Sequence, residues 1–130
     1  MLAEEVGYPY NQIPTETFLG YAGGFGQASL CGTVGVGTNF IYAVCDKETA
    51  ARLSGELYKW YKEANFPYYQ PEGLDLKQTV ANSTLCGDSV AIWMKESGYE
   101  YGSDERKSRC AGVAADTAKK VIELLNAELG

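Results

Sequence analysis

The chain has 130 residues, of which 45% are hydrophobic and 22% charged, and this balance is typical of one folded domain. Its net charge of −6 argues against nucleic acid and anionic membrane surfaces as partners. The sequence contains no histidine, which excludes Ser–His and Cys–His nucleophile pairs, His-containing zinc sites and His-ligated haem on this chain.

The N-terminal third is poor in charge and rich in glycine. Residues 1–14 carry aromatic and proline residues without periodicity, which predicts an extended arm, and they lack the pattern of a signal peptide. From Thr17 to Cys45 there is no charged residue, but the many glycines argue against a membrane span. We expect a glycine-rich segment that leads into a buried helix capped by Ser29. The apolar stripe of that helix is Leu30, Val34, Gly37, Ile41 and Val44.

The next helix is predicted to be capped by Asp46 and to end before Pro67. Its apolar face consists of Ala50, Leu53, Leu57, Trp60, Tyr61 and Ala64. Residues 65–81 contain prolines and tyrosines without periodicity and predict a long loop.

Two further helices are expected in the C-terminal half. The first begins near Asn82 or Ser83 and stops at Gly98, and the second is capped by Ser103. The inward face of the last helix is predicted to be Cys110, Val113, Ala114, Thr117, Val121, Leu124 and Leu125. The face predicted to meet water is Asp116, Lys119, Lys120 and Glu123. No alternating strand pattern is present, so the sequence predicts an all-α fold, a compact bundle of about four helices that forms a single domain over residues 1–130.

The four cysteines are the candidate chemical groups, and none lies in a Cys-x-x-Cys pair: Cys31, Cys45, Cys86 and Cys110. Any one cysteine alone is more often a buried core residue than a ligand. Cys31 and Cys86, however, are predicted in the first turns of helices, where the positive helix end lowers a thiol pKa and favours the thiolate that binds metal. Gly32 and Gly87 follow them and would leave space for a cofactor.

Cys45 poses a geometric problem. It follows Cys31 by fourteen residues, which is roughly 21 Å of rise along an unbroken helix. Such a pair could neither form a disulfide nor share a small cluster. Convergence of all four sulfur atoms therefore requires the segment to bend at its glycines, and otherwise Cys45 stands apart.

Four islands of sequence carry a resemblance to a known family: GGFGQASLCGTVGVG (23–37), GELYKWY (55–61), STLCGDSVAIWM (83–94) and ERKSRCAGVAADTAKKVIELLN (105–126). They resemble the redox-active family named for four cysteines and a CGAxxG motif, and more closely the cysteine-bearing N-terminal domain of split-Soret cytochromes c. In that comparison Thr33 stands in place of the motif alanine and Val36 in place of its closing glycine. No cysteine lies upstream of Cys31, where many members have one, and no counterpart of the haem-binding half appears.

The resemblance implies a helical domain with a cysteine pocket that holds an iron–sulfur centre, [2Fe–2S] in the first instance. Carried over by position, the metal ligands would be Cys31, Cys86 and Cys110, with Cys45 as the remaining match. Gly32 and Gly87 would border the cofactor. A periplasmic location would follow from the resemblance, and a cytoplasmic one if the chain is full length as given.

The leading hypothesis is thus an electron-transfer protein that binds a small iron–sulfur cluster and exchanges electrons with a redox partner such as a cytochrome. Thiolate ligation by four cysteines is the usual arrangement for such clusters. The alternatives are a thiol–disulfide redox protein and a non-catalytic helical interaction module whose cysteines belong to the core. A homodimer is compatible with either redox interpretation, although the sequence indicates no interface. No carboxylate pair is placed for acid–base catalysis, and we assign no catalytic residue.

Overall fold

The computed structural model describes residues 2–130, apart from the side chains of Leu2 and Glu72. The elements in chain order are α1 (Leu2–Glu5), η1 (Tyr10–Gln12), η2 (Thr15–Tyr21), η3 (Gly24–Ala28), α2 (Gly32–Val44), α3 (Lys47–Glu63), β1 (Asn65–Phe66), η4 (Pro71–Gly73), β2 (Thr79–Val80), α4 (Cys86–Ser97) and α5 (Asp104–Leu129). The predicted all-α fold is confirmed, because the only sheet in the described chain is the two-residue pairing of β1 with β2.

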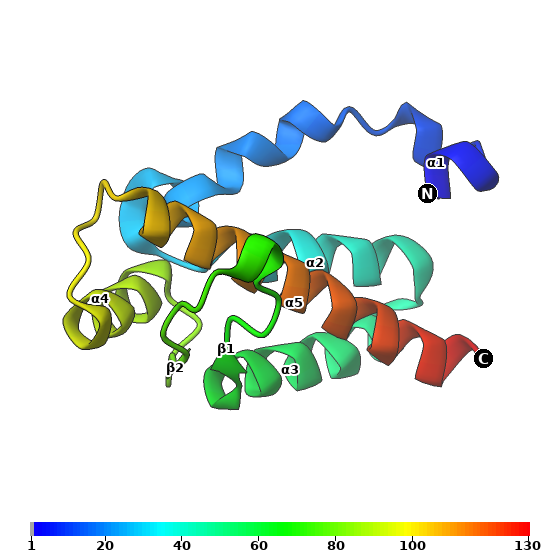
Figure 1. Ribbon diagram of the computed structural model, residues 1–130. Coiled ribbons are helices and arrows are strands. Elements are labelled where there is room, and N and C mark those ends of the chain that lie inside the picture. The colour runs from blue at the N-terminus through cyan, green and yellow to red at the C-terminus, as the bar shows by residue number, and fades with distance from the viewer. Residues whose placement is uncertain (1) are drawn as a thin grey trace.

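Helices α2, α3 and α5 form the centre of the molecule, and α5 packs against both of the others (Figure 1). Their shared core is apolar and includes Val34 and Ile41 from α2, Leu57 from α3 and Val113 from α5. The fourth long helix, α4, packs beside β2 and the η3 turn at one end of α5. No helix among residues 2–130 is long and apolar enough to cross a membrane.

Three predicted helix boundaries are confirmed by their cap geometry. The Asp46 carboxylate accepts hydrogen bonds from the backbone N–H groups of Glu48 and Thr49, both at 3.0 Å, and so begins α3. The Ser103 hydroxyl accepts from the Arg106 N–H at 3.2 Å and begins α5. Gly98 ends α4 in the left-handed conformation with φ 80°, which glycine adopts without steric cost.

The starts of α2 and α4 differ from the prediction. Ser29 does not cap α2, because its hydroxyl donates to the carbonyl of Gly24 at 2.6 Å, inside the η3 turn. Cys31 is the residue that precedes α2, and α4 begins at Cys86 instead of Asn82 or Ser83. Both helices therefore start later than expected, and each start falls at a cysteine.

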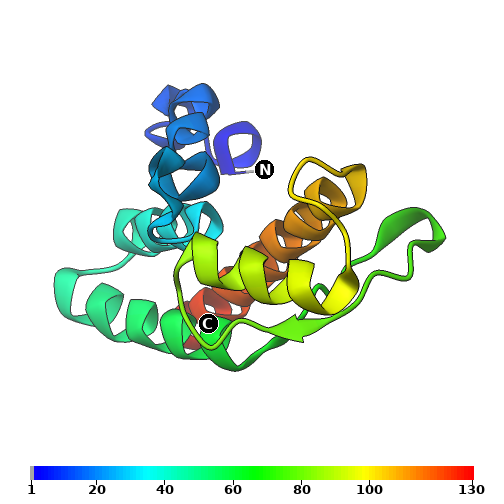
Figure 2. The same ribbon diagram turned by 90° about the vertical axis from the view of Figure 1, so that its left-hand side faces the viewer.

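The N-terminal arm is helical and not extended. Residues 2–21 fold into α1, η1 and η2, and neither η1 nor η2 buries a residue. Figures 1 and 2 show this arm as a separate layer on the side of α2 that faces away from α3. Met1 lies outside the described residues. The arm, α2 and α5 line a large apolar groove of about 1780 Å³.

The loop between α3 and α4 packs against α5 through Asp116. Its carboxylate accepts hydrogen bonds from the backbone N–H groups of Tyr68 at 2.6 Å and Tyr69 at 3.0 Å, and Asp116 is only 6% exposed. The prediction that Asp116 faces water is therefore wrong, because the loop covers that part of the helix. Gly112 permits this close approach, since a Cβ there would lie 2.6 Å from the Tyr69 carbonyl oxygen.

Candidate metal centre

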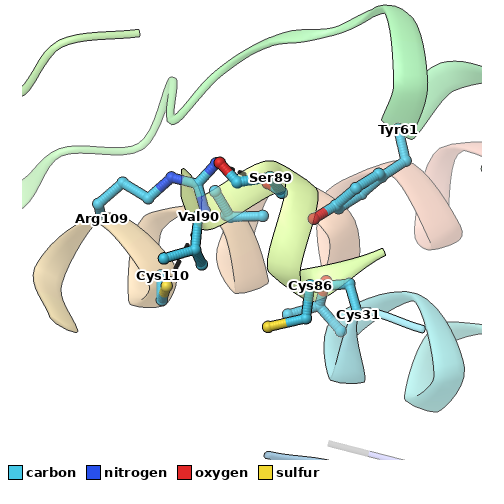
Figure 3. A pocket seen from close by; sticks show the side chains of 9 residues that line it. Cys31, Tyr61, Cys86, Ser89, Val90, Arg109 and Cys110 are labelled. Carbon is cyan, nitrogen blue, oxygen red and sulfur yellow. Dashed lines mark hydrogen bonds between the residues drawn. The ribbon is translucent and has the colours of Figure 1, made fainter. Parts of the chain in front are cut away.

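Three of the four cysteines line one small cavity of about 30 Å³. They come from the starts of α2 and α4 and from the second turn of α5, which are distant in sequence. The residues around the cavity are Cys31, Thr33, Tyr61, Cys86, Ser89, Val90, Arg109, Cys110 and Val113 (Figure 3). The same three cysteines also line the apolar groove, so the cavity opens toward it.

A backbone bridge fixes Cys31 next to Cys86. The N–H of Cys31 donates to the carbonyl of Thr84 at 2.8 Å, and the N–H of Cys86 donates to the carbonyl of Ser29 at 2.7 Å. Leu30 and Leu85 thereby form an isolated antiparallel β-bridge. Each strand of the bridge runs directly into a helix, and the two helix starts bring the two thiols to the same end of the cavity.

Cys110 lies between two arginines of α5. A guanidinium N–H of Arg106 is 3.8 Å from its sulfur, and one of Arg109 is 3.9 Å away. Both guanidinium groups therefore place positive charge beside this sulfur. Arg106 also donates to the Tyr101 carbonyl and lies over the Tyr101 ring, which holds its side chain at the rim of the cavity.

The environment of Cys86 is different from what the helix start alone predicts. Burial raises the pKa of the Cys86 thiol, and the neighbouring Cys31 and Cys110 raise it further because thiolates repel one another. The charges of Arg109 and Arg106 oppose this rise. The expected lowering of the Cys86 pKa by the helix end is therefore outweighed.

Hydroxyl groups complete the wall of the cavity. The Thr33 hydroxyl lies 3.4 Å from the Cys31 sulfur and 3.2 Å from the hydroxyl of Thr117. Ser89 accepts a hydrogen bond from Arg109 at 2.8 Å. Figure 3 shows the Tyr61 hydroxyl and the Arg109 guanidinium extending toward Ser89 from opposite sides.

Sequence analysis missed Arg109 as a site residue and placed Tyr61 only on an apolar helix face. A signal for Arg109 was available. It precedes Val113 by four residues, so a charged residue occupies the core-facing stripe of α5. A charged residue in such a stripe needs a buried partner, and this requirement marks it as a candidate.

Cys45 lies away from this group. Helix α2 is unbroken from Gly32 to Val44, so its glycines do not bend it, and Cys45 follows its last turn. The rise of such a helix separates Cys31 from Cys45 by roughly 20 Å. Cys45 instead packs half-buried against the hydrophobic core.

Gly32 and Gly87 serve the packing of the N-terminal segment. A Cβ on Gly32 would lie 2.5 Å from the Tyr21 carbonyl oxygen, and one on Gly87 would lie 3.1 Å from the Cβ of Ala28. Neither glycine lines the small cavity, although both line the groove. Their small size thus allows residues 21–28 to approach the starts of α2 and α4 closely.

The donor set fits a metal centre of thiolates. Three sulfur ligands, two nearby cations and several hydroxyl donors are what a soft, negatively charged metal–thiolate group requires. Within residues 2–130, however, no three Cys, Asp or Glu side chains lie close enough to share a single metal ion.

Comparison with known proteins identifies relatives of this chain. The family described as "Putative redox-active protein (C_GCAxxG_C_C)" matches residues 1–124. Split-Soret cytochrome c of Desulfovibrio desulfuricans is 31% identical over 137 residues, which cover 99% of this chain and 49% of that protein. A solved structure, described as a novel iron centre in the split-Soret cytochrome c from Desulfovibrio desulfuricans, matches with a TM-score of 0.93 and 28% identity. It covers 98% of this chain and 56% of that one, so our chain spans about half the length of these relatives.

The family pattern clarifies the motif around Cys31. In the order GCAxxG, Gly32 takes the alanine position and Gly35 the closing glycine, which corrects the assignment of Thr33 and Val36 to those positions. A Cβ on Gly35 would lie 2.8 Å from the Tyr21 ring, so the closing glycine has a packing role. Because the family model matches residues 1–124, the chain belongs to the C_GCAxxG_C_C family of redox-active proteins.

Proposed function

We propose that this chain is an electron-transfer protein that binds an iron-containing centre through Cys31, Cys86 and Cys110. The observation that carries the proposal is the convergence of these three thiols, from three helices, on one cavity beside the guanidinium of Arg109. Membership of a redox-active family and the iron centre named for the D. desulfuricans relative support the same conclusion.

The centre we propose is an iron–sulfur cluster, with [2Fe–2S] as the first candidate. Cysteine thiolates are the usual ligands of such clusters, and three of them line the cavity. Cys45 is not part of this ligand set because an intact helix separates it from the cavity. One ligand position of a [2Fe–2S] cluster is then filled by a group other than a cysteine of this chain.

The partner we propose is a redox protein, and a cytochrome is the first candidate because the relative of known structure is one. Electrons would pass through the side of the cavity that opens to the groove, where Cys31, Cys86 and Cys110 border an apolar surface. Apolar surface next to a redox centre is suited to close contact between proteins, since contact brings the centres near one another without a large desolvation cost.

The proposal is tested by reconstituting the metal-free protein with iron and sulfide in the absence of oxygen. Iron and sulfide content, visible absorption and electron paramagnetic resonance are then measured for the natural chain, Cys86→Ser and Cys45→Ser. We expect Cys86→Ser to lose the cluster and Cys45→Ser to retain it. A natural chain that takes up no iron would reject the proposal, and equal loss in the two variants would reject the ligand set.

The metal-free and iron-loaded proteins also distinguish the iron centre from the alternative of thiol–disulfide redox chemistry. All four cysteines are free in the structure. A thiol–disulfide protein would lose two free thiols on mild oxidation and regain them with reductant, without binding iron. An iron centre instead predicts that bound metal protects three thiols from alkylation. Cys45 is half-buried, and its rate of alkylation should be the same with and without metal.

A further inference from the structure

Arg109 is a buried cation without an anionic partner. Its side chain is 2% exposed, and among the described residues no carboxylate forms an ion pair with it. The guanidinium donates to the hydroxyl of Ser89 at 2.8 Å, lies 5.4 Å from the centre of the Phe66 ring, and leaves its Nε without a hydrogen bond. An uncompensated charge in the interior is strongly destabilising, so the position demands an explanation.

The buried carboxylate on the same helix does not supply the missing charge. Asp116 lies two turns further along α5 and accepts its hydrogen bonds from the backbone of Tyr68 and Tyr69. The Phe66 ring offers a weaker attraction of the cation–π kind. The cavity lies on the other side of the guanidinium, which donates to the Cys110 sulfur at 3.9 Å.

Tyr61 is a second unmatched donor at the same place. It is 0% exposed, lines the cavity, and its hydroxyl has no hydrogen-bond partner among the described residues. Burial raises the pKa of this phenol well above its ordinary value, and the adjacent Cys31 raises it further. A phenol hydroxyl can donate one hydrogen bond, and this one points into the cavity (Figure 3).

We propose that Arg109 and Tyr61 are positioning residues for the thiolate centre, in which the guanidinium neutralises its negative charge and the phenol donates a hydrogen bond to it. This inference rests on the proposed function and adds two residues to it that are not metal ligands. Three thiolates around iron give a negatively charged group, which a buried cation and a buried donor stabilise. Among the described residues, the Arg109 guanidinium has no carboxylate partner and its Nε has no hydrogen bond, and the Tyr61 hydroxyl has no acceptor.

The test compares metal-free and iron-loaded protein for Arg109→Met and Tyr61→Phe. Arg109→Met removes the charge and keeps an apolar side chain of similar length, and Tyr61→Phe removes only the hydroxyl. The matched controls are Arg52→Met, which removes an exposed arginine paired with Glu56 and Glu128, and Tyr58→Phe, which removes a hydroxyl outside the cavity.

Arg109→Met should have opposite effects on the metal-free and the iron-loaded protein. Without metal, Arg109→Met should unfold in urea at the same or a higher midpoint than the natural chain, since an unpaired charge is gone. With the centre in place, the variant should release iron to a chelator about 10- to 100-fold faster, the range expected for loss of a supporting group. The midpoint potential of the centre in Arg109→Met should fall, because the reduced centre carries more negative charge and loses more from the missing cation. Each tenfold loss in the equilibrium constant for reduction lowers the potential by about 59 mV.

Tyr61→Phe should leave the stability of the metal-free protein nearly unchanged, lower the potential, and quicken iron release by less than Arg109→Met. The controls should match the natural chain in iron release and potential. An Arg109→Met protein that is destabilised equally with and without metal, or that does not fold without metal, would overturn the role of Arg109. An unchanged potential in Tyr61→Phe would overturn that of Tyr61. A natural chain that binds no iron would instead reject the proposed function itself.

Discussion

Asp116→Ala should destabilise the protein by about 3 kcal/mol, because it removes the acceptor that fixes the loop between α3 and α4 to α5. Two backbone N–H groups donate to this carboxylate, at 2.6 and 3.0 Å. Hydrogen bonds to a charged acceptor contribute about 1.5–3 kcal/mol each, so the pair represents about 3–6 kcal/mol. We expect the lower end, because Tyr68 and Tyr69 are exposed and water can reach their N–H groups when the loop loosens.

The measurement is equilibrium unfolding in urea of the metal-free protein, with the midpoint and slope fitted separately. A loss of this size is a large part of the about 5–15 kcal/mol that stabilises an ordinary domain, so the midpoint should fall clearly. Asp116→Asn keeps one acceptor oxygen and should lose about half as much. Glu123→Ala, an exposed position on the same helix with ion contacts at 4.0 Å, should change stability by less than about 1 kcal/mol. A loss below about 1 kcal/mol for Asp116→Ala would refute the assignment of the loop to this carboxylate.

Three further outcomes follow from the contacts of the fold. Gly112→Ala should lower the unfolding free energy in urea by about 1–3 kcal/mol, since the added Cβ would lie 2.6 Å from the backbone of the loop. Gly55→Ala has open space around it and should raise the unfolding free energy by about 1 kcal/mol. Equal effects of the two substitutions would contradict the packing of Gly112 against the loop. Burial raises the pKa of Cys86 and of Tyr61, so at alkaline pH the native state keeps protons that the unfolded chain loses. The unfolding free energy of the metal-free protein should therefore be constant below about pH 9 and fall as the pH rises beyond it. An unfolding free energy that does not change with pH would argue against a buried thiol and phenol. Ser103→Ala should cost about 1 kcal/mol of unfolding free energy by removing the cap of α5, and no loss would show that the exposed helix start finds water instead.

Local sequence signals predicted the parts of the fold that depend on local interactions. Helix ends depend on contacts within a few residues. The side chains of Asp46 and Ser103 accept hydrogen bonds from the first backbone N–H groups of their helices, and Gly98 ends its helix in the left-handed conformation. The same reasoning failed at Ser29, whose hydroxyl turns back to Gly24, since a serine can serve a tight turn as well as a helix.

Of the candidate site, the sequence predicted the residue type of the candidate ligands but not how they come together. The cysteines were recognised as candidate ligands, but the bridge that brings Cys31 to Cys86 joins segments more than fifty residues apart and has no periodic signature. Asp116 was misplaced for a similar reason, because an irregular loop covers it and helical periodicity carries no information about loops. The position of Cys45 away from the cavity follows from the continuity of α2, which the glycines of that helix made uncertain in the sequence.

The β-bridge between Leu30 and Leu85 has a consequence for how the proposed centre would be assembled. Small metal-dependent domains are commonly unstructured until the metal arrives, so that binding and folding are one event. Here two of the three thiols are spaced by main-chain hydrogen bonds that need no metal. Hydrogen exchange at the amides of Cys31 and Cys86 should therefore be slow before any iron is added. Iron insertion would then be a late step on an already ordered polypeptide, and removal by a chelator would be reversible without a refolding stage.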